Sequence, residues 1–297
     1  MILNKNNESK IINGKNYSKD FLIHVSNLAF KFENLLNRKP CLAVILIGDD
    51  NASKVYVKNK ILTAKDTNIK SIEILLSNNT SEINLLNEIN KLNNDDRIDG
   101  ILVQLPLPDH IQVKKVVNSI SPKKDVDGFH PQNFGNLILG NETVVPCTPL
   151  GCWYMLKKEL NDLTGYHAVV IGRSNIVGKP MQSLLIKENC TVTVAHSKTK
   201  GLAEISNKAD ILIAAIGRPE FITSEFINSN SVIIDVGINR VNKKLVGDVR
   251  FQDGLKIAKK ITPVPGGVGP MTIACLMYNT VKLAYRRNNQ MFNEILL

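Results

Sequence analysis

Apolar residues occur in this chain as short, nearly unbroken runs, and the segments between the runs are long enough for helices. Runs rich in Val, Ile and Leu that alternate with helices are typical of a parallel sheet covered on both faces. The pattern therefore predicts an α/β fold. The expected strands are 41–47, 71–76, 100–104, 167–171, 191–195, 211–216 and 232–236.

The alternation is interrupted by Leu-Pro-Leu-Pro at 105–108 and by a loop-like stretch at 122–145, and it resumes near Tyr166. We therefore predict two α/β domains that flank a cleft, with a boundary near Cys147. The first domain is expected to comprise 1–147 and a helix at 271–297 that returns to it after a Pro/Gly-rich loop, and the second 148–270. Ligand sites in such folds lie at the carboxyl ends of strands and in domain clefts.

Composition fits an ordinary globular protein, because 43% of the 297 residues are hydrophobic and 22% are charged. The start of the chain has no apolar signal core, and no stretch approaches the ~20 apolar residues of a membrane helix. We expect a soluble cytoplasmic protein without a membrane partner. The five cysteines include no Cys-x-x-Cys pair, so neither a disulfide framework nor a structural metal is expected.

The formal charge of +10 leaves three interpretations open. A nucleic-acid-binding module is one, although the lysines are scattered among asparagines and form no basic stripe with interleaved aromatic residues. An acidic small ligand fits equally well, and so does a general bias of the chain towards Lys and Asn.

The segment 52–60 follows the first apolar run and the turn 48–51. A helix that begins near Ser53 places Ser53, Tyr56 and Lys60 on one face. Burial beside an aromatic ring lowers the pKa of a lysine, which then acts as an acid or a base. Taken alone, this spacing is more often found on a solvated helix.

Residues 167–180 predict a strand, a tight turn and the start of a helix. Gly172 suits the turn, Gly178 allows the helix to lie close to the sheet, and free amides at the helix start favour a phosphate group. The loop differs from G-x-G-x-x-G, because Ser174 replaces the middle glycine and one residue is added before the last. It is a dinucleotide-type loop.

A dehydrogenase selective for NAD usually carries an Asp or Glu about 20 residues after this loop. The corresponding segment 195–198 has no acid. Arg173, Ser174 and His196 would instead meet a phosphate, which favours NADP. Two further strands end in the glycine-containing segments 214–219 and 235–240, where a nicotinamide or ribose can approach the backbone. Each of these alone is explained better as a simple turn.

Four more segments join these motifs in order: 103–108, 124–129, 146–149 and 262–272. With them, the chain closely resembles the bifunctional methylenetetrahydrofolate dehydrogenase and methenyltetrahydrofolate cyclohydrolase family over roughly residues 10 to 285. The loop Pro-Gly-Gly-Val-Gly-Pro-Met at 265–271 is its most specific motif.

The resemblance implies a role for several residues. Lys60 corresponds to the essential lysine of the cyclohydrolase step, Gln104 would bond Lys60 and tune its protonation, Tyr56 would stack on the aminobenzoate ring, and Asp127 would hold the pteridine. The implied catalytic residues are Lys60, Gln104, Tyr56 and Asp127, and the implied substrate contacts are Ser53, Tyr56, Asp127, Pro265, Gly266 and Gly267.

The resemblance further implies NADP as cofactor, tetrahydrofolate derivatives with an acidic glutamate tail as substrates, no nucleic acid partner, and a homodimer formed through the second domain. The expected cofactor contacts are Thr148, Gly172, Arg173, Ser174, Ile176, His196, Ser197, Ile216, Gly217 and Ile238. Leu62 and Arg250 depart from the family pattern without removing an expected ligand. A dehydrogenase that lacks the hydrolytic step is the enzymic alternative, against which Lys60 and Gln104 argue.

Overall fold

The structure, a computed structural model, describes residues 8–292. Contacts within the chain divide it into two units. One comprises the described residues up to Ser18 together with Thr148–Thr272, and the other comprises Lys19–Cys147 and the segment from Ile273 onward. The division falls inside three helices, α2 (Gly14–Leu36), α7 (Cys147–Leu160) and α11 (Val268–Arg287).

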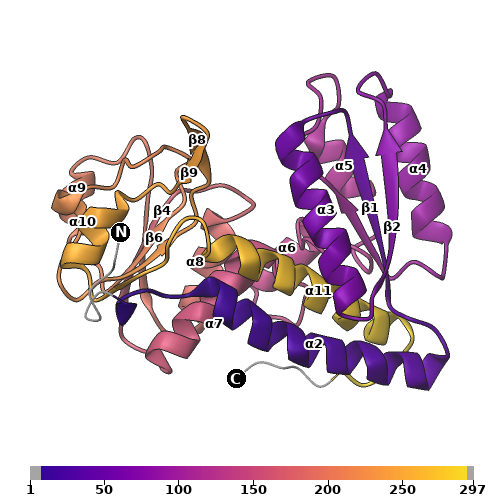
Figure 1. Ribbon diagram of the computed structural model, residues 1–297, viewed down its shortest axis with the longest axis horizontal. Helices are drawn as coiled ribbons and strands as arrows, with labels where there is room; N and C mark the ends of the chain where they lie inside the picture. Colours follow the sequence, from indigo (N-terminus) through magenta and orange to yellow (C-terminus); the bar gives the residue numbers. More distant parts are fainter. Residues whose placement is uncertain (1–7, 293–297) are drawn as a thin grey trace. The chain divides into compact units, whose positions relative to one another are not determined.

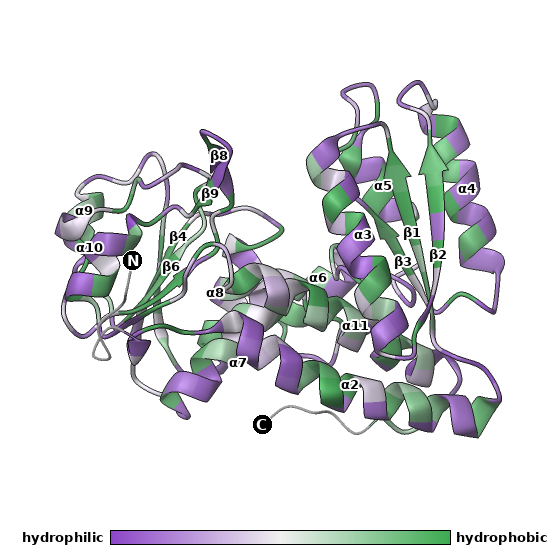
Figure 2. Cartoon of the chain, viewed as in Figure 1, coloured by the Kyte–Doolittle hydropathy of each residue, from purple (hydrophilic) through white to green (hydrophobic). Residues whose placement is uncertain are grey.

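The unit around Lys19–Cys147 contains a parallel sheet of three strands in the order β2-β1-β3 (β1 and β2 are labelled in Figure 1, and all three strands in Figure 2). The strands are β1 (Cys41–Ile47), β2 (Lys70–Leu76) and β3 (Gly100–Val103). Every residue of the central strand β1 is buried, whereas β2 alternates with exposed positions as an edge strand does. Figure 2 shows these strands as the apolar centre of the unit.

Two helices connect these strands, α3 (Asn51–Asp66) and α4 (Glu82–Asn94), and two more follow β3, α5 (Val113–Ser119) and α6 (Pro131–Ile138). Side chains of α4 and α5 pack with Ala43 and Ile45 on one face of β1. The side chains of β1 alternate between the two faces of the sheet, and α3 also contacts β1 and β2. Asp50 begins α3 by accepting a hydrogen bond from the Ser53 backbone N–H at 2.7 Å.

The unit around Thr148–Thr272 contains a parallel sheet of five strands in the order β10-β7-β6-β4-β5. They are β4 (His167–Ile171), β5 (Thr191–Ala195), β6 (Ile211–Ala214), β7 (Val232–Asp235) and β10 (Lys260–Ile261), with an antiparallel hairpin of β8 (Asn239–Val241) and β9 (Lys244–Val246). The helices are α8 (Gly178–Lys187), α9 (Leu202–Ser206), α10 (Phe251–Ile257) and the 3-10 helix η1 (Ser224–Phe226).

The N-terminal segment adds to this second sheet. The Ile12 backbone N–H donates to Ile261 O at 2.9 Å, and the Ile261 N–H donates to Lys10 O at 2.8 Å. The edge of β10 is therefore paired. The described residues up to Ser18 belong to this unit, although the sequence predicts them in the first domain. The sequence could not show this pairing, because β10 has only two residues and so short a strand has no recognisable periodicity.

The predicted α/β class with mostly parallel sheets is confirmed. Two expectations were wrong. The stretch 122–145 is not a loop throughout, because α6 lies in it, where Pro131 suits the first turn of a helix. The last helix does not extend over 271–297, since α11 begins at Val268 and ends at Arg287, and Asn293–Leu297 lie outside the described residues.

Two further features concern membrane spans and the cysteines. None of the helices within residues 8–292 is long and apolar enough to cross a membrane. All five cysteines are buried free thiols.

Candidate active-site residues

Helix α3 presents one buried face to the rest of its unit. Ser53 and Lys60 are buried and Tyr56 is half-buried, whereas Lys58 is exposed. The helix begins at Asn51, two residues before the predicted start, because Asp50 caps it. The spacing of three and seven residues brings the three side chains to the same face, as the sequence predicts.

Lys60 meets Gln104 at the carboxyl end of β3. The Lys60 ammonium nitrogen Nζ donates to Gln104 Oε1 at 2.9 Å. Gln104 Nε2 donates to the Leu105 carbonyl at 2.6 Å, so the amide oxygen is the atom left to face the lysine. The Gln104 backbone N–H is itself held by Ile45 O at 2.9 Å, which ties this side chain to β1.

The surroundings of Lys60 make it less basic than an exposed lysine. Burial removes solvent from the ammonium and lowers the pKa of Lys60, while the charge of Asp127 and, to a smaller extent, Cys147 acts in the opposite direction. A neutral lysine still has N–H groups with which to donate to Gln104, and its lone pair is then free to accept a proton. The arrangement therefore suits a base that loses its proton more readily than an exposed lysine does.

Asp127 lies on a segment that runs along the outer edge of β3. The Ile101 backbone N–H donates to Lys124 O at 2.7 Å, which fixes the start of this segment beside the strand. Asp127 lines a small recess together with apolar side chains that include Val103 and Phe129. Burial raises the pKa of Asp127 to about 6, and the nearby charge of Lys60 lowers it in part.

Two residues beside Asp127 had no role in the sequence prediction. Cys147 Sγ donates to Val126 O at 3.4 Å and to Asp127 Oδ1 at 3.9 Å. Asn279, on α11, donates from Nδ2 to Val126 O at 2.8 Å and to Val145 O at 2.9 Å. Asn279 follows the apolar run 273–277 of α11, where a buried amide needs partners, and this is the one signal in the sequence that indicates such a contact.

In the other unit, the turn after β4 is very closely packed. Gly172 has a φ of +133°, and a Cβ there would lie 2.2 Å from Ala215 O in the segment after β6. A Cβ at Gly178 would lie 2.1 Å from Gly172 O. Only glycine fits at both positions. The first turn of α8 therefore lies against the end of β4, as a dinucleotide loop requires.

The residues between these glycines are open to solvent. Arg173, Ser174 and Ile176 are exposed. Ser174 Oγ accepts from the Val177 N–H at 3.1 Å and from the Gly178 N–H at 3.4 Å, so this hydroxyl already satisfies two amides that the sequence had left for a phosphate. The guanidinium of Arg173 remains available for an anion.

The segment after β5 carries His196 and Ser197. His196 Nδ1 accepts from the Lys198 N–H at 3.2 Å, so the neutral ring bears its proton on Nε2. The His196 backbone N–H donates to Thr199 Oγ1 at 2.9 Å. Ser197 is exposed. The ring and the exposed hydroxyl are hydrogen-bond donors for a phosphate group.

The remaining predicted residues lie at other loop ends of the same unit. Ile216 and Gly217 follow β6, and Ile238 follows β7 and is 46% exposed. Thr148 Oγ1 lies 3.0 Å from Thr272 Oγ1. In the loop after β10, Gly266 O accepts from the Lys15 N–H at 3.1 Å. The roles of Thr148 and of Pro265, Gly266 and Gly267 as ligand contacts stay predictions.

The structure thus assembles two sets of residues. Lys60, Gln104 and Asp127 belong to one unit, with Tyr56 one turn before Lys60. The predicted cofactor residues after β4, β5, β6 and β7 lie at the carboxyl ends of parallel strands in the other unit. Within residues 8–292, no group of three His, Cys, Asp or Glu side chains is placed to hold a metal ion.

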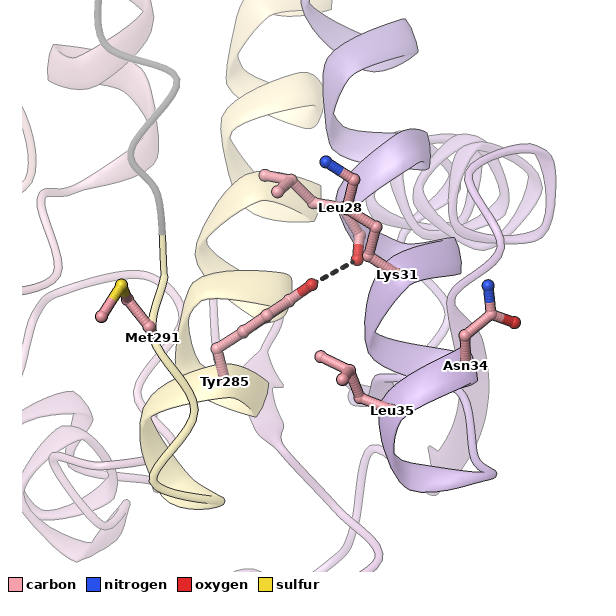
Figure 3. A pocket seen from close by; sticks show the side chains of 6 residues that line it. All are labelled: Leu28, Lys31, Asn34, Leu35, Tyr285 and Met291. Carbon is pink, nitrogen blue, oxygen red and sulfur yellow. Dashed lines mark hydrogen bonds between the residues drawn. The ribbon is translucent and has the colours of Figure 1, made fainter.

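A pocket of about 420 Å³ lies elsewhere, between α2 and the end of α11 (Figure 3). It contains none of the predicted site residues. The Tyr285 hydroxyl that borders it donates to Leu28 O at 2.9 Å. Its lining residues are Leu28, Lys31, Asn34, Leu35, Tyr285 and Met291. This largely apolar lining, in which Lys31 carries the only charge, provides no acid–base pair for catalysis.

Two family profiles match the chain. The catalytic domain of tetrahydrofolate dehydrogenase/cyclohydrolase matches residues 12–127, and the NAD(P)-binding domain of the same family matches residues 146–288. A Rhizorhabdus wittichii protein named bifunctional protein FolD 3 is 52% identical over 287 residues, which is 95% of this chain and 94% of that protein.

Solved structures agree with these matches. The Campylobacter jejuni bifunctional FolD methylenetetrahydrofolate dehydrogenase/cyclohydrolase is 46% identical, with a TM-score of 0.91 over 93% of this chain and 99% of that chain. The Trypanosoma brucei methylenetetrahydrofolate dehydrogenase-cyclohydrolase, solved with NADP and an inhibitor, is 34% identical, with a TM-score of 0.89 over 93% of this chain and 97% of that chain.

Proposed function

Because the chain belongs to the tetrahydrofolate dehydrogenase/cyclohydrolase family, we propose that Lys60, Gln104 and Asp127 form the centre of its folate chemistry. The protein is a bifunctional enzyme of one-carbon metabolism. It oxidises 5,10-methylenetetrahydrofolate to the 5,10-methenyl form with NADP, and it hydrolyses that product to 10-formyltetrahydrofolate.

The observation that carries the assignment of the hydrolytic step is the 2.9 Å hydrogen bond between buried Lys60 and Gln104. Addition of water to the methenyl carbon and opening of the ring both move protons. A lysine whose pKa is lowered by burial can take a proton from the water and return one to the leaving nitrogen. We assign both transfers to Lys60.

Gln104 positions the amine in this scheme. Its own amide nitrogen is engaged by Leu105 O, so the orientation of Oε1 towards Lys60 is fixed. We assign Asp127 to the pteridine, whose amino group and ring nitrogen are donors that a carboxyl group can accept. The half-buried ring of Tyr56 is assigned to the aminobenzoate group, and Ser53 to the adjoining part of the substrate.

The residues after β4 and β5 fit NADP. The turn at Gly172 has no room for a side chain, as a dinucleotide loop requires. Arg173 and Ser197 are exposed where no acid competes for a phosphate. NADP, when bound, accepts the hydride from the methylene carbon. That transfer needs no enzymic base, so the residues of this unit serve to bind and to orient.

We further infer three properties of the enzyme in the cell. The five unpaired cysteines fit a reducing compartment, which supports the cytoplasm as its location. The charge of +10 fits substrates whose glutamate tail is extended by further glutamates. The family resemblance supports a homodimer formed through the unit that carries the NADP residues.

An assay of both steps with the purified full-length protein tests the function. Reduced cofactor and methenyltetrahydrofolate are followed separately, with methylenetetrahydrofolate as substrate and with either NADP or NAD. Cofactor reduction with NADP, followed by loss of the methenyl signal, is expected. Reduction without hydrolysis would support a dehydrogenase alone. No reduction, together with salt-sensitive binding to DNA or RNA, would favour the nucleic-acid module.

A further inference from the structure

Asp248 is a fully buried carboxylate between β9 and α10 that has no role in the folate chemistry assigned to Lys60, Gln104 and Asp127. Its oxygen Oδ2 accepts from the backbone N–H of Ile216 at 2.6 Å and of Gly217 at 2.9 Å. Its oxygen Oδ1 accepts from the Arg218 N–H at 2.9 Å and from Asn239 Nδ2 at 2.9 Å. One side chain therefore holds three consecutive amides of the turn that follows β6.

A second buried carboxylate holds Asp248 itself. Asp235, the last residue of β7, accepts from the backbone N–H of Asp248 at 2.9 Å and from that of Val249 at 2.9 Å. A Cβ at Gly247 would lie 1.8 Å from Asp235 Oδ2, and one at Gly237 would lie 2.3 Å from Asp248 Oδ1. The two carboxylates thus connect the ends of β6 and β7 to the segment that follows β9, and no side chain fits at Gly237 or Gly247 beside them.

The turn held by Asp248 lies where the sheet order reverses. From β4 the chain passes to β5 on one side and then to β6 on the other. A dinucleotide crosses a parallel sheet at such a point. The phosphate-binding residues follow β4 and β5, so the nicotinamide half of the cofactor falls at the ends of β6 and β7. Ile216 and Gly217 are the residues that follow β6.

We propose that Asp248 is a positioning residue for the dehydrogenase step, which holds the backbone of Ile216, Gly217 and Arg218 in the shape that receives the nicotinamide half of NADP. The inference rests on the proposed function. Asp248 itself is buried beneath this turn and acts through it.

The four donors around Asp248 require a carboxylate. An asparagine at this position keeps the volume but replaces one oxygen by an NH₂ group, which is a donor. Whichever way that amide is turned, its NH₂ group faces either the Ile216 and Gly217 amides or the Arg218 amide and Asn239 Nδ2. One pair of donors then loses its acceptor, and the turn must move to satisfy it.

The test uses the full-length protein with Asp248→Asn. The KM for NADP is expected to rise by at least about tenfold, with a smaller fall in the dehydrogenase kcat. The cyclohydrolase kcat/KM, measured with methenyltetrahydrofolate, is expected to stay within about twofold of the wild-type value, because its residues lie in the other unit. The matched control is Asp210→Asn, whose carboxylate accepts from the His167 N–H at the amino end of the same sheet.

A milder variant keeps the test decisive if Asp248→Asn does not fold. Asn239→Ala removes one of the four donors to Asp248 from a partly exposed hairpin position, and a rise of about threefold in the KM for NADP is expected. An unchanged KM for NADP in every variant that folds would overturn the inference, and so would an equal loss of both activities. Wild-type protein without either activity would instead overturn the proposed function, on which the inference rests.

Discussion

The side chains of Lys60 and Gln104 come from positions 44 residues apart in the sequence and meet at 2.9 Å between Nζ and Oε1. Lys60 lies on the third turn of α3, and Gln104 is the first residue after β3. The strand fixes the glutamine backbone, the Leu105 carbonyl fixes its amide, and burial lowers the pKa of the lysine. The pair therefore consists of a base of reduced basicity and the group that orients it.

Replacement of Lys60 by methionine tests its role in hydrolysis. Methionine keeps the length and the burial of the side chain but cannot transfer a proton, so the cyclohydrolase rate is expected to fall by about 10²- to 10⁴-fold. The hydride step needs no base, and methenyltetrahydrofolate should therefore accumulate during turnover with NADP. The measurement is the methenyl signal beside that of reduced cofactor.

The control for this variant is Lys58→Met. Lys58 lies on the exposed face of the same helix, so its loss should leave both rates within about twofold of those of the wild type. Hydrolysis by Lys60→Met at a rate close to that of the wild type would rule out Lys60 as the proton-transfer group.

Replacement of Gln104 by glutamate tests how the protonation of Lys60 is set. A carboxylate next to the ammonium favours the charged lysine and raises its pKa, by about 1 to 3 units for a close opposite charge. Because the neutral amine is the proposed base, the acidic limb of the cyclohydrolase pH profile should move to higher pH by a similar amount.

The pH profile of kcat is the measurement, and Gln252→Glu is the matched control. Gln252 is exposed in the first turn of α10, in the other unit, and the same change of charge there should not move the profile. An acidic limb that stays in place in Gln104→Glu would show that Lys60 does not limit the rate by its protonation.

Most strands of the two parallel sheets could be predicted from the sequence because they are short runs rich in Val, Ile and Leu. The bounds of β1, β4 and β5 agree with the prediction. The strands β3, β6 and β7 end one or two residues earlier than expected. The residue after a strand can still form one backbone hydrogen bond although the paired ladder has ended. One example is the bond from the Val236 N–H to Ala214 O at 2.9 Å.

The parts that could not be predicted depend on partners that are distant in the sequence. Strand β10 has two residues, and its pairing with Ile12 follows from tertiary structure alone. Helical periodicity places Lys60 on a face with Tyr56, but it does not show which residue faces them. Nothing in the sequence distinguishes Asp235 and Asp248 from ordinary turn residues, because the backbone amides that donate hydrogen bonds to them come from other segments.

The raised pKa of Asp127 predicts how stability depends on pH. Its ordinary value is 3.8 and its value in the folded protein is about 6. Between these values the folded state retains a proton that the unfolded state releases, so the free energy of unfolding falls as pH rises through this window. At about 1.4 kcal/mol per pH unit, the loss is about 3 kcal/mol over the whole window and about 2 kcal/mol of it falls between pH 4 and pH 6.

Asp127→Asn removes this titration. The free energy of unfolding of the variant minus that of the wild type should therefore be larger at pH 7.5 than at pH 4.5, by about 2 to 3 kcal/mol. Urea unfolding at each pH measures it. Asp66→Asn, an exposed position on α3, serves as the control. The same stability difference between variant and wild type at both pH values would contradict the prediction.

Replacement of Arg173 by alanine tests the preference for NADP. The guanidinium is exposed directly after the close turn at Gly172, and the segment after β5 presents His196 and Ser197 instead of an acid. A phosphate on the ribose gains a charge-assisted hydrogen bond from the arginine that the unphosphorylated cofactor does not gain. The KM for NADP should rise by about tenfold or more, and the KM for NAD should change by less than about twofold.

The measurement is the dehydrogenase KM for each cofactor at one fixed salt concentration, because phosphate contacts weaken as salt rises. Lys187→Ala removes one positive charge at the far end of α8 and separates a local contact from the general effect of net charge. If Arg173→Ala changed both KM values by the same factor, the arginine would not distinguish the two cofactors. The selectivity would then have to come from His196 and Ser197 after β5.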